Sequence, residues 1–143
     1  MNRNKTMHEI TVEAVTENLE QVTQFADAFL EQIGCPMKVQ IQIDIVIDEL
    51  FSNIAHYAYT PGTGTATMRI EAAENPEAVV LTFLDRGVPY NPLEKEDPDI
   101  TLSAEQRSIG GLGIYMVKKT MDELSYAYQD GQNILTARKL LRK

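Results

Sequence analysis

The chain has little of what marks a secreted, disulfide-bonded or membrane-spanning protein. It contains one cysteine, Cys35, so no disulfide can form within the chain. A reduced side chain near a turn is the simplest interpretation of that residue. We find neither a signal peptide nor an apolar run long enough to span a bilayer. The expected location is therefore the cytosol.

Positive charge is also scarce. Lys and Arg number 13 against 21 Asp and Glu, which gives a net charge of -8, and no long basic run is present. Nucleic acid and anionic membrane are therefore poor candidates as partners. An acidic protein can still bind ATP if backbone N–H groups and Mg²⁺ meet the phosphates.

What the chain does have is the length and composition of one compact domain. It has 143 residues, of which 43% are apolar and 24% charged. These values are ordinary for a globular domain with a hydrophobic core, and they leave little room for a second domain. We therefore predict a single domain over residues 1–143.

The N-terminal part of the chain predicts a strand followed by a helix. Apolar and polar residues alternate over residues 8–15, which is typical of a half-buried strand. Asn18 is a candidate N-cap of the helix, with Gln21 at the capping-box position. Apolar residues then recur at helical spacing until Gly34, which is well placed to end the helix.

The next segment gives two conflicting signals. Over residues 39–47, β-branched residues alternate as they do in a strand, yet the apolar residues also form a helical stripe that continues to Ile54. We favour a helix, because the segment runs unbroken from Pro36 to about Tyr59 and is too long for a typical strand.

The second half of the chain predicts more strands and one further helix. Residues 66–72 alternate as a strand, and residues 78–84 are apolar on both faces, as expected of a central strand. Glycines at 110–113 precede a helical pattern. Residues 124–141 then read as a hairpin that turns at Asp130-Gly131.

Two polar residues of the long predicted helix could act on one ligand. Glu49 and Asn53 are four residues apart, so they share one face of the helix. A carboxylate can take a proton from a hydroxyl group, and an amide oxygen can join a Mg²⁺ shell. The spacing alone is weak, since it is common on solvated helix faces. His56 lies on the same face and is a candidate for lining a pocket rather than for acting as a base.

Two glycine-containing motifs have plausible nucleotide roles. Asp85 follows the predicted central strand and could accept a hydrogen bond from the amino group of adenine, while Gly87 lacks a Cβ, so a flat base can approach the backbone. Gly111 and Gly113 stand at a helix start, where free N–H groups can face phosphate. Each motif alone could be an ordinary turn, and neither is a P-loop or a dinucleotide fingerprint.

In this order, the three motifs resemble the ATP-binding domain shared by gyrase, histidine kinases, heat-shock chaperones and mismatch-repair ATPases. Within that superfamily the match is to the small anti-sigma-factor serine/threonine kinases. Residues 48–59 resemble the family's asparagine box and residues 84–89 its first glycine box. Residues 111–117, followed by residues 121–123, resemble its second glycine box. The resemblance covers nearly the whole chain.

The resemblance implies an α+β two-layer sandwich, the Bergerat fold, in which helices pack on one face of a mixed, mostly antiparallel sheet. A lid over residues 90–108 would cover ATP. Mg²⁺ would bind Asn53, and Glu49 would be the catalytic base. Residues expected to bind the nucleotide come from all three motifs and the segment before the third: Asn53, His56, Asp85, Gly87, Val88, Arg107, Gly110, Gly111, Leu112 and Gly113. Whether Arg107 touches the terminal phosphate or is solvated stays open.

The resemblance also implies a function and partners. The substrate would be a serine or threonine hydroxyl of a small anti-sigma-factor antagonist protein. A sigma factor, bound and held inactive, would be the alternative partner, and the protein would pair as a homodimer. Two other functions stay open at this point. One is a non-catalytic module that binds ATP and sequesters a regulatory protein, and the other is a nucleotide-binding half that serves a separate receptor protein.

Overall fold

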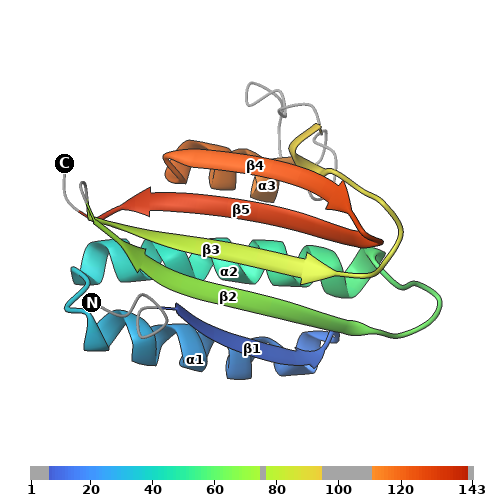
Figure 1. Ribbon diagram of the computed structural model, residues 1–143, viewed down its shortest axis with the longest axis horizontal. Helices are drawn as coiled ribbons and strands as arrows, with labels where there is room; N and C mark the ends of the chain where they lie inside the picture. Colours follow the sequence, from blue (N-terminus) through green and yellow to red (C-terminus); the bar gives the residue numbers. More distant parts are fainter. Residues whose placement is uncertain (1–6, 75–76, 95–110, 142–143) are drawn as a thin grey trace.

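The protein has two layers, a five-stranded sheet and three helices that cover one face of it (Figure 1). The computed structural model describes residues 7–74, 77–94 and 111–141, and these numbers of strands and helices are those of the described residues. The helices are α1 (Leu19–Gln32), α2 (Met37–Tyr57) and α3 (Gly111–Thr120), and the strands are β1 (Met7–Glu13), β2 (Thr65–Ala73), β3 (Ala78–Asp85), β4 (Glu123–Gln129) and β5 (Gln132–Leu140). Two short 3₁₀ turns are η2 (Thr16–Asn18) and η3 (Pro92–Glu94). The predicted two-layer fold is confirmed.

The sheet is antiparallel at every described pairing, where a mixed, mostly antiparallel sheet was expected. Its strand order is β1-β2-β3-β5-β4. The crossover through α3 joins β3 to β4, and these two strands point the same way. They do not pair, because β5 lies between them and is antiparallel to both. As predicted, β3 is the central strand.

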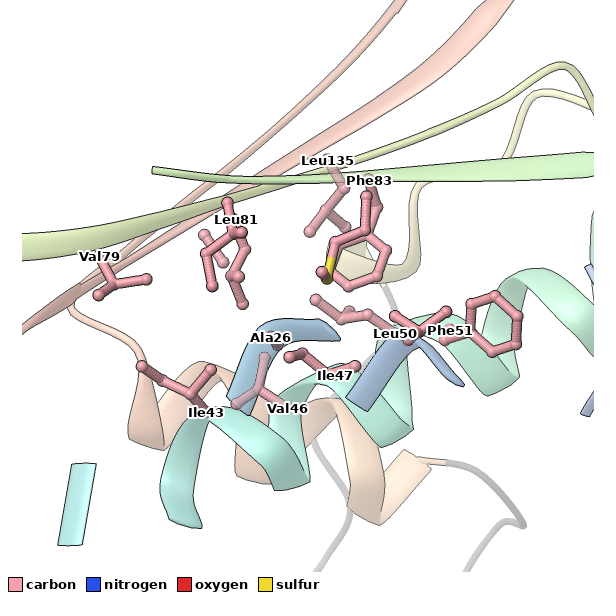
Figure 2. Close-up of a cluster of buried hydrophobic side chains, with 14 of the residues drawn as sticks. Ala26, Ile43, Val46, Ile47, Leu50, Phe51, Val79, Leu81, Phe83 and Leu135 are labelled. Carbon is pink, nitrogen blue, oxygen red and sulfur yellow. The ribbon is translucent and has the colours of Figure 1, made fainter. Parts of the chain in front are cut away.

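The ambiguous segment is a helix, as predicted. Val39, Ile43, Val46 and Ile47 of α2 are buried, whereas Ile41 is 53% exposed. Only the helical stripe thus faces the sheet. Figure 2 shows Ile43, Val46, Ile47 and Leu50 below Leu81 and Phe83 of β3 and Leu135 of β5. This apolar layer fixes the rotation of α2, and so fixes which of its polar residues face away from the core.

The start of α1 differs from the predicted capping box. Asn18 is the residue before the helix, but its side chain does not cap it. Its backbone is already helical (φ -92°, ψ 0°) because η2 precedes it, whereas a capping residue is normally extended. Its amide Nδ2 instead donates to the Glu13 carbonyl at 2.9 Å. At the other end Gly34 adopts φ +74°, which explains why the helix stops there.

The end of α3 is tied to β5 by polar contacts. The Lys139 ammonium group, on a residue that is 8% exposed, donates to the Thr120 carbonyl at 2.9 Å. The Leu140 N–H donates to the Asp122 carboxylate at 2.7 Å, and the Asp122 N–H donates to the Arg138 carbonyl at 2.8 Å. Residues 121–123, the last part of the second glycine box, therefore join the end of α3 to β5. No helix in the described part of the chain is long and apolar enough to cross a membrane.

Asp27 of α1 and Asp44 of α2 form an acidic pair between the two helices. Burial, with the hydrogen bond and the negative charge of Asp27 as further causes, raises the pKa of Asp44 to about 7. Gln40 donates to Asp27 at 3.2 Å, and Oδ1 of Asp44 is buried without a hydrogen-bond partner among the described residues. Between about pH 4 and pH 7, Asp44 therefore holds a proton in the folded protein that it has released in the unfolded chain.

This pair predicts a stability that falls as pH rises. Between about pH 4 and pH 7 the folded state binds more protons than the unfolded state, so the free energy of unfolding decreases and then levels off above pH 7. We expect Asp44→Asn to flatten this dependence when the melting temperature is measured from pH 5 to pH 8. Asp130→Asn, a change in an exposed turn, is the control and should keep the wild-type slope. Equal slopes in wild type and Asp44→Asn would contradict the assignment.

Candidate active site

A cleft opens between the C-terminal half of α2 and the ends of β3, β4 and β5. The space among its lining atoms, open solvent at the mouth included, is about 460 Å³. Most of the wall is apolar or aromatic, with a few polar side chains at separate points. The lining residues are Leu50, Asn53, Ile54, Tyr57, Ala58, Phe83, Asp85, Val88, Tyr90, Pro92, Tyr126, Asn133 and Leu135.

Glu49 lies beside the start of α3. A Cβ atom added to Gly113 would lie 2.7 Å from Oε1 of Glu49 and closer still to Oε2. Only glycine therefore allows the carboxylate to occupy this position. Burial raises the pKa of Glu49, and the neighbouring charge of Asp48 raises it further. The structure thus brings together two predicted residues from separate motifs.

Asn53 lies one helical turn after Glu49 and lines the cleft. Its side-chain amide forms no hydrogen bond with any described residue, so its oxygen is free to bind a ligand. No group of three His, Cys, Asp or Glu side chains that could hold a metal ion occurs among the described residues. The Asn53 amide oxygen is compatible with Mg²⁺, an oxygen-binding ion that usually keeps several waters and takes few protein ligands together with substrate phosphates.

Asp85 forms the polar end of the cleft. It is 7% exposed, and its Oδ1 accepts two hydrogen bonds, from the Gly87 N–H at 2.9 Å and from Nδ2 of Asn133 at 2.9 Å. Its Oδ2 accepts none from the described residues. The side chain thus keeps one acceptor for a ligand, as a role in recognising an amino group requires.

The structure gives a different reason for a glycine at position 87 from the one that the sequence predicted. A Cβ there would lie 2.5 Å from the carbonyl carbon of Ala58 and closer still to its oxygen. The space expected to admit a flat base is thus filled by the end of α2. The next residue, Val88, lines the cleft and is 59% exposed, and its N–H donates to the Ala58 carbonyl at 2.9 Å. Gly87 therefore holds the segment after β3 against the helix.

His56 does not line the cleft, contrary to expectation. Its side chain is exposed and packs against Tyr57, with ring centroids 6.2 Å apart. Three residues along a helix correspond to a rotation of about 300°, so His56 is turned about 60° from Asn53. This turn points His56 away from the side of α2 that carries Ile54 and Tyr57 and lines the cleft.

The remaining predicted residues belong to the approach to α3. Gly111 and Leu112 form its first positions, followed by Gly113. Arg107 and Gly110 lie outside the described residues, as does most of the predicted lid. The backbone of the second glycine box is therefore at a helix start, as its proposed role with phosphate requires.

Sequence reasoning missed Asn133 and Tyr126. Asn133 is 6% exposed and opposes Asp85 in the pairing of β5 with β3. Tyr126 on β4 donates its hydroxyl to Oδ1 of Asn133, and burial raises the pKa of that phenol. A signal was present, since Asn133 is the one uncharged polar residue on the inward face of β5, in line with Leu135 and Ala137.

The chain is similar to known proteins. The model of the histidine kinase-like ATPase domain matches residues 12–139. The serine/threonine-protein kinase BtrW of Bordetella bronchiseptica is 29% identical over 99 residues, which are 69% of each chain. The serine-protein kinase RsbW of Bacillus thuringiensis is 27% identical over 103 residues, which cover 69% of this chain but 63%, less than two thirds, of that protein.

A solved structure supports the fold. The Acinetobacter baumannii histidine kinase AdeS superposes with a TM-score of 0.50 over 98% of this chain and 72% of that chain, at 12% identity. Identity this low supports the shared fold alone.

Proposed function

The chain belongs to the histidine kinase-like ATPase domain family, and on that premise we propose that it is an ATP-dependent serine/threonine protein kinase acting as an anti-sigma regulatory factor. The kinase names of BtrW and RsbW support the activity. The substrate would be a serine or threonine of a small anti-sigma-factor antagonist protein. A sigma factor would be a second partner, bound and held inactive.

One observation carries this proposal, namely the contact between the Glu49 carboxylate and Gly113 at the start of α3. Free N–H groups at a helix start attract phosphate. A carboxylate beside phosphates repels them, so it weakens simple binding. Beside an incoming hydroxyl group, however, it can take up the proton. The contact therefore favours an enzyme over a module that only binds ATP.

The reaction follows from these positions. The base of ATP enters the cleft toward Asp85, and the phosphates extend toward Gly111, Leu112 and Gly113. The substrate hydroxyl oxygen forms a bond to the γ-phosphorus, and the bond from that phosphorus to the β–γ bridging oxygen breaks. Glu49 accepts the hydroxyl proton, and ADP leaves.

Asn53 would hold Mg²⁺ through its amide oxygen. When bound, the ion supplies positive charge that offsets the charge on the phosphates. Asn53 is suited to this task because its side chain is free of other described hydrogen bonds and faces the cleft that also contains Asp85.

Several parts of the proposal rest on the family resemblance. Arg107 and Gly110 would lie beside the phosphates, and residues 1–143 would form one domain. The protein would act in the cytosol as a homodimer. Each of these points stays a prediction.

Labelled ATP tests the activity directly. The protein is incubated with γ-labelled ATP, Mg²⁺ and candidate antagonist proteins, and label on a serine or threonine is measured. Transfer that disappears when the acceptor serine or threonine is replaced by alanine supports the kinase. A partner that binds tightly and never receives label would instead identify a sequestering module.

The role proposed for Asp85 predicts a preference for ATP over GTP. In Asp85→Asn the amide oxygen must take the place of Oδ1, because the Gly87 N–H and Nδ2 of Asn133 both require an acceptor. The new NH₂ group then stands where the free Oδ2 was, and it repels the amino group of adenine. We expect the ratio of ATP to GTP affinity to fall by at least about a hundredfold in calorimetric titrations. An unchanged ratio would remove Asp85 from base recognition.

A further inference from the structure

The side chain of Asn133 uses its full hydrogen-bonding capacity within the protein. Its Nδ2 donates to Oδ1 of Asp85 and to the Val88 carbonyl, both at 2.9 Å. Its Oδ1 accepts from the Tyr90 N–H at 3.1 Å and from the Tyr126 hydroxyl. A primary amide has two N–H donors and one oxygen with two lone pairs, so no capacity is left for a ligand.

These four partners also fix which way the amide faces. If the amide were flipped, its NH₂ group would meet the Tyr90 N–H, which is itself a donor, and its oxygen would meet the Asp85 carboxylate. Either contact would leave buried polar groups unpaired. Asn133 is therefore a rigid link between β5, Asp85 and the segment that follows β3.

The consequence for Asp85 is a single orientation of its carboxylate. Gly87 N–H and Asn133 Nδ2 both hold Oδ1, so rotation of the carboxylate would break two hydrogen bonds. One carboxylate oxygen is consequently always held by both donors, and the free oxygen always occupies the same position. Without Asn133 only the Gly87 bond would remain, and the position of the free acceptor would no longer be fixed.

We propose that Asn133 is a positioning residue that sets the selectivity between adenine and guanine by holding Asp85 in one orientation. It acts through Asp85 and does not contact the nucleotide. The inference rests on the proposed binding of ATP at this cleft. It adds that discrimination requires the Asn133 donor as well as the Asp85 acceptor.

The experiment uses a pair of variants that have nearly the same shape. Asn133→Thr supplies a hydroxyl group that can donate to Asp85 in place of the amide, whereas Asn133→Val has a methyl group where threonine has that hydroxyl. Affinities for Mg·ATP and Mg·GTP are measured by calorimetry on the full chain, with melting temperatures alongside. We expect the ratio of ATP to GTP affinity to fall at least about tenfold in Asn133→Val, and to stay nearer the wild-type value in Asn133→Thr.

A control separates selectivity from stability. Lys139→Met removes a hydrogen bond from a similarly buried residue of the same strand, outside the cleft. It should lower the melting temperature and leave the ratio unchanged. If Asn133→Val does not fold, Asn133→Ser and Asn133→Ala make the same comparison with smaller side chains.

The outcomes distinguish this inference from the proposed function. Equal weakening of ATP and GTP in Asn133→Val, with an unchanged ratio, would overturn the positioning role of Asn133. A ratio that falls as far in Asn133→Thr as in Asn133→Val would do the same, since the hydroxyl donor would then have no effect. Wild-type protein that binds ATP and GTP equally would instead contradict the adenine site itself.

Discussion

Glu49→Gln is expected to bind ATP at least as tightly as the wild type, because the amide no longer repels the phosphates, and to bind its protein partner about as tightly. We expect it to transfer phosphate about 10²–10⁴-fold more slowly. The substitution keeps the shape of the side chain and removes its ability to accept a proton. The Glu49 carboxylate lies beside Gly113 and forms no described hydrogen bond with Asp85 or Asn53. Those two residues are the ones assigned to adenine and to Mg²⁺. Binding and transfer should therefore separate in this variant.

The measurement is single-turnover transfer to the true partner, so that product release cannot mask the chemical step. Calorimetry with Mg·ATP provides the control for binding. If the variant transfers phosphate at the wild-type rate, Glu49 is not the catalytic base. If it loses ATP binding as well, Glu49 contributes to nucleotide binding and not only to proton transfer.

Gly113→Ala is expected to reduce transfer nearly as much as Glu49→Gln, although Gly113 carries no side chain. The added Cβ would occupy the space of the Glu49 carboxylate. A glutamate side chain is flexible and can move away, so we expect the fold to survive with a melting temperature close to that of the wild type. Alanine also favours a helix over glycine by about 1 kcal/mol, which partly offsets any strain. What should be lost is the position of the carboxylate.

A double-mutant cycle tests this explanation. If Gly113→Ala acts only by displacing Glu49, the double variant Glu49→Gln/Gly113→Ala should transfer phosphate no more slowly than Glu49→Gln alone. If instead the rate reductions of the two single variants multiply in the double variant, Gly113 acts independently of Glu49, for example through its N–H at the start of α3. Full wild-type activity in Gly113→Ala would show that the contact with Glu49 has no role in transfer.

The sequence alone predicts the helices and strands, and it names most residues of the candidate site. Hydrophobic periodicity predicted each helix and strand, because an element must bury one face and the spacing of its apolar residues records that face. The central strand was identifiable because β3 is apolar on both sides. Three motifs in order placed Glu49, Asn53, Asp85 and Gly113 together in one prediction, and the family to which they pointed is confirmed.

The tertiary structure decided what depends on contacts between distant residues. The position of β5 between β3 and β4 removes the parallel pairing that a mixed sheet would have, and no local pattern records that order. Position 87 requires glycine because Ala58 lies where a Cβ would be. His56 is exposed because it is turned about 60° from Asn53 around α2, away from the cleft.

Asn133 shows the same limit most clearly. In the sequence it is one polar residue at the start of a strand, 48 positions from Asp85. Only the pairing of β5 with β3 puts its amide against that carboxylate, and only burial makes those hydrogen bonds obligatory. Local propensity depends on neighbours along the chain, whereas this role depends on which strand lies alongside.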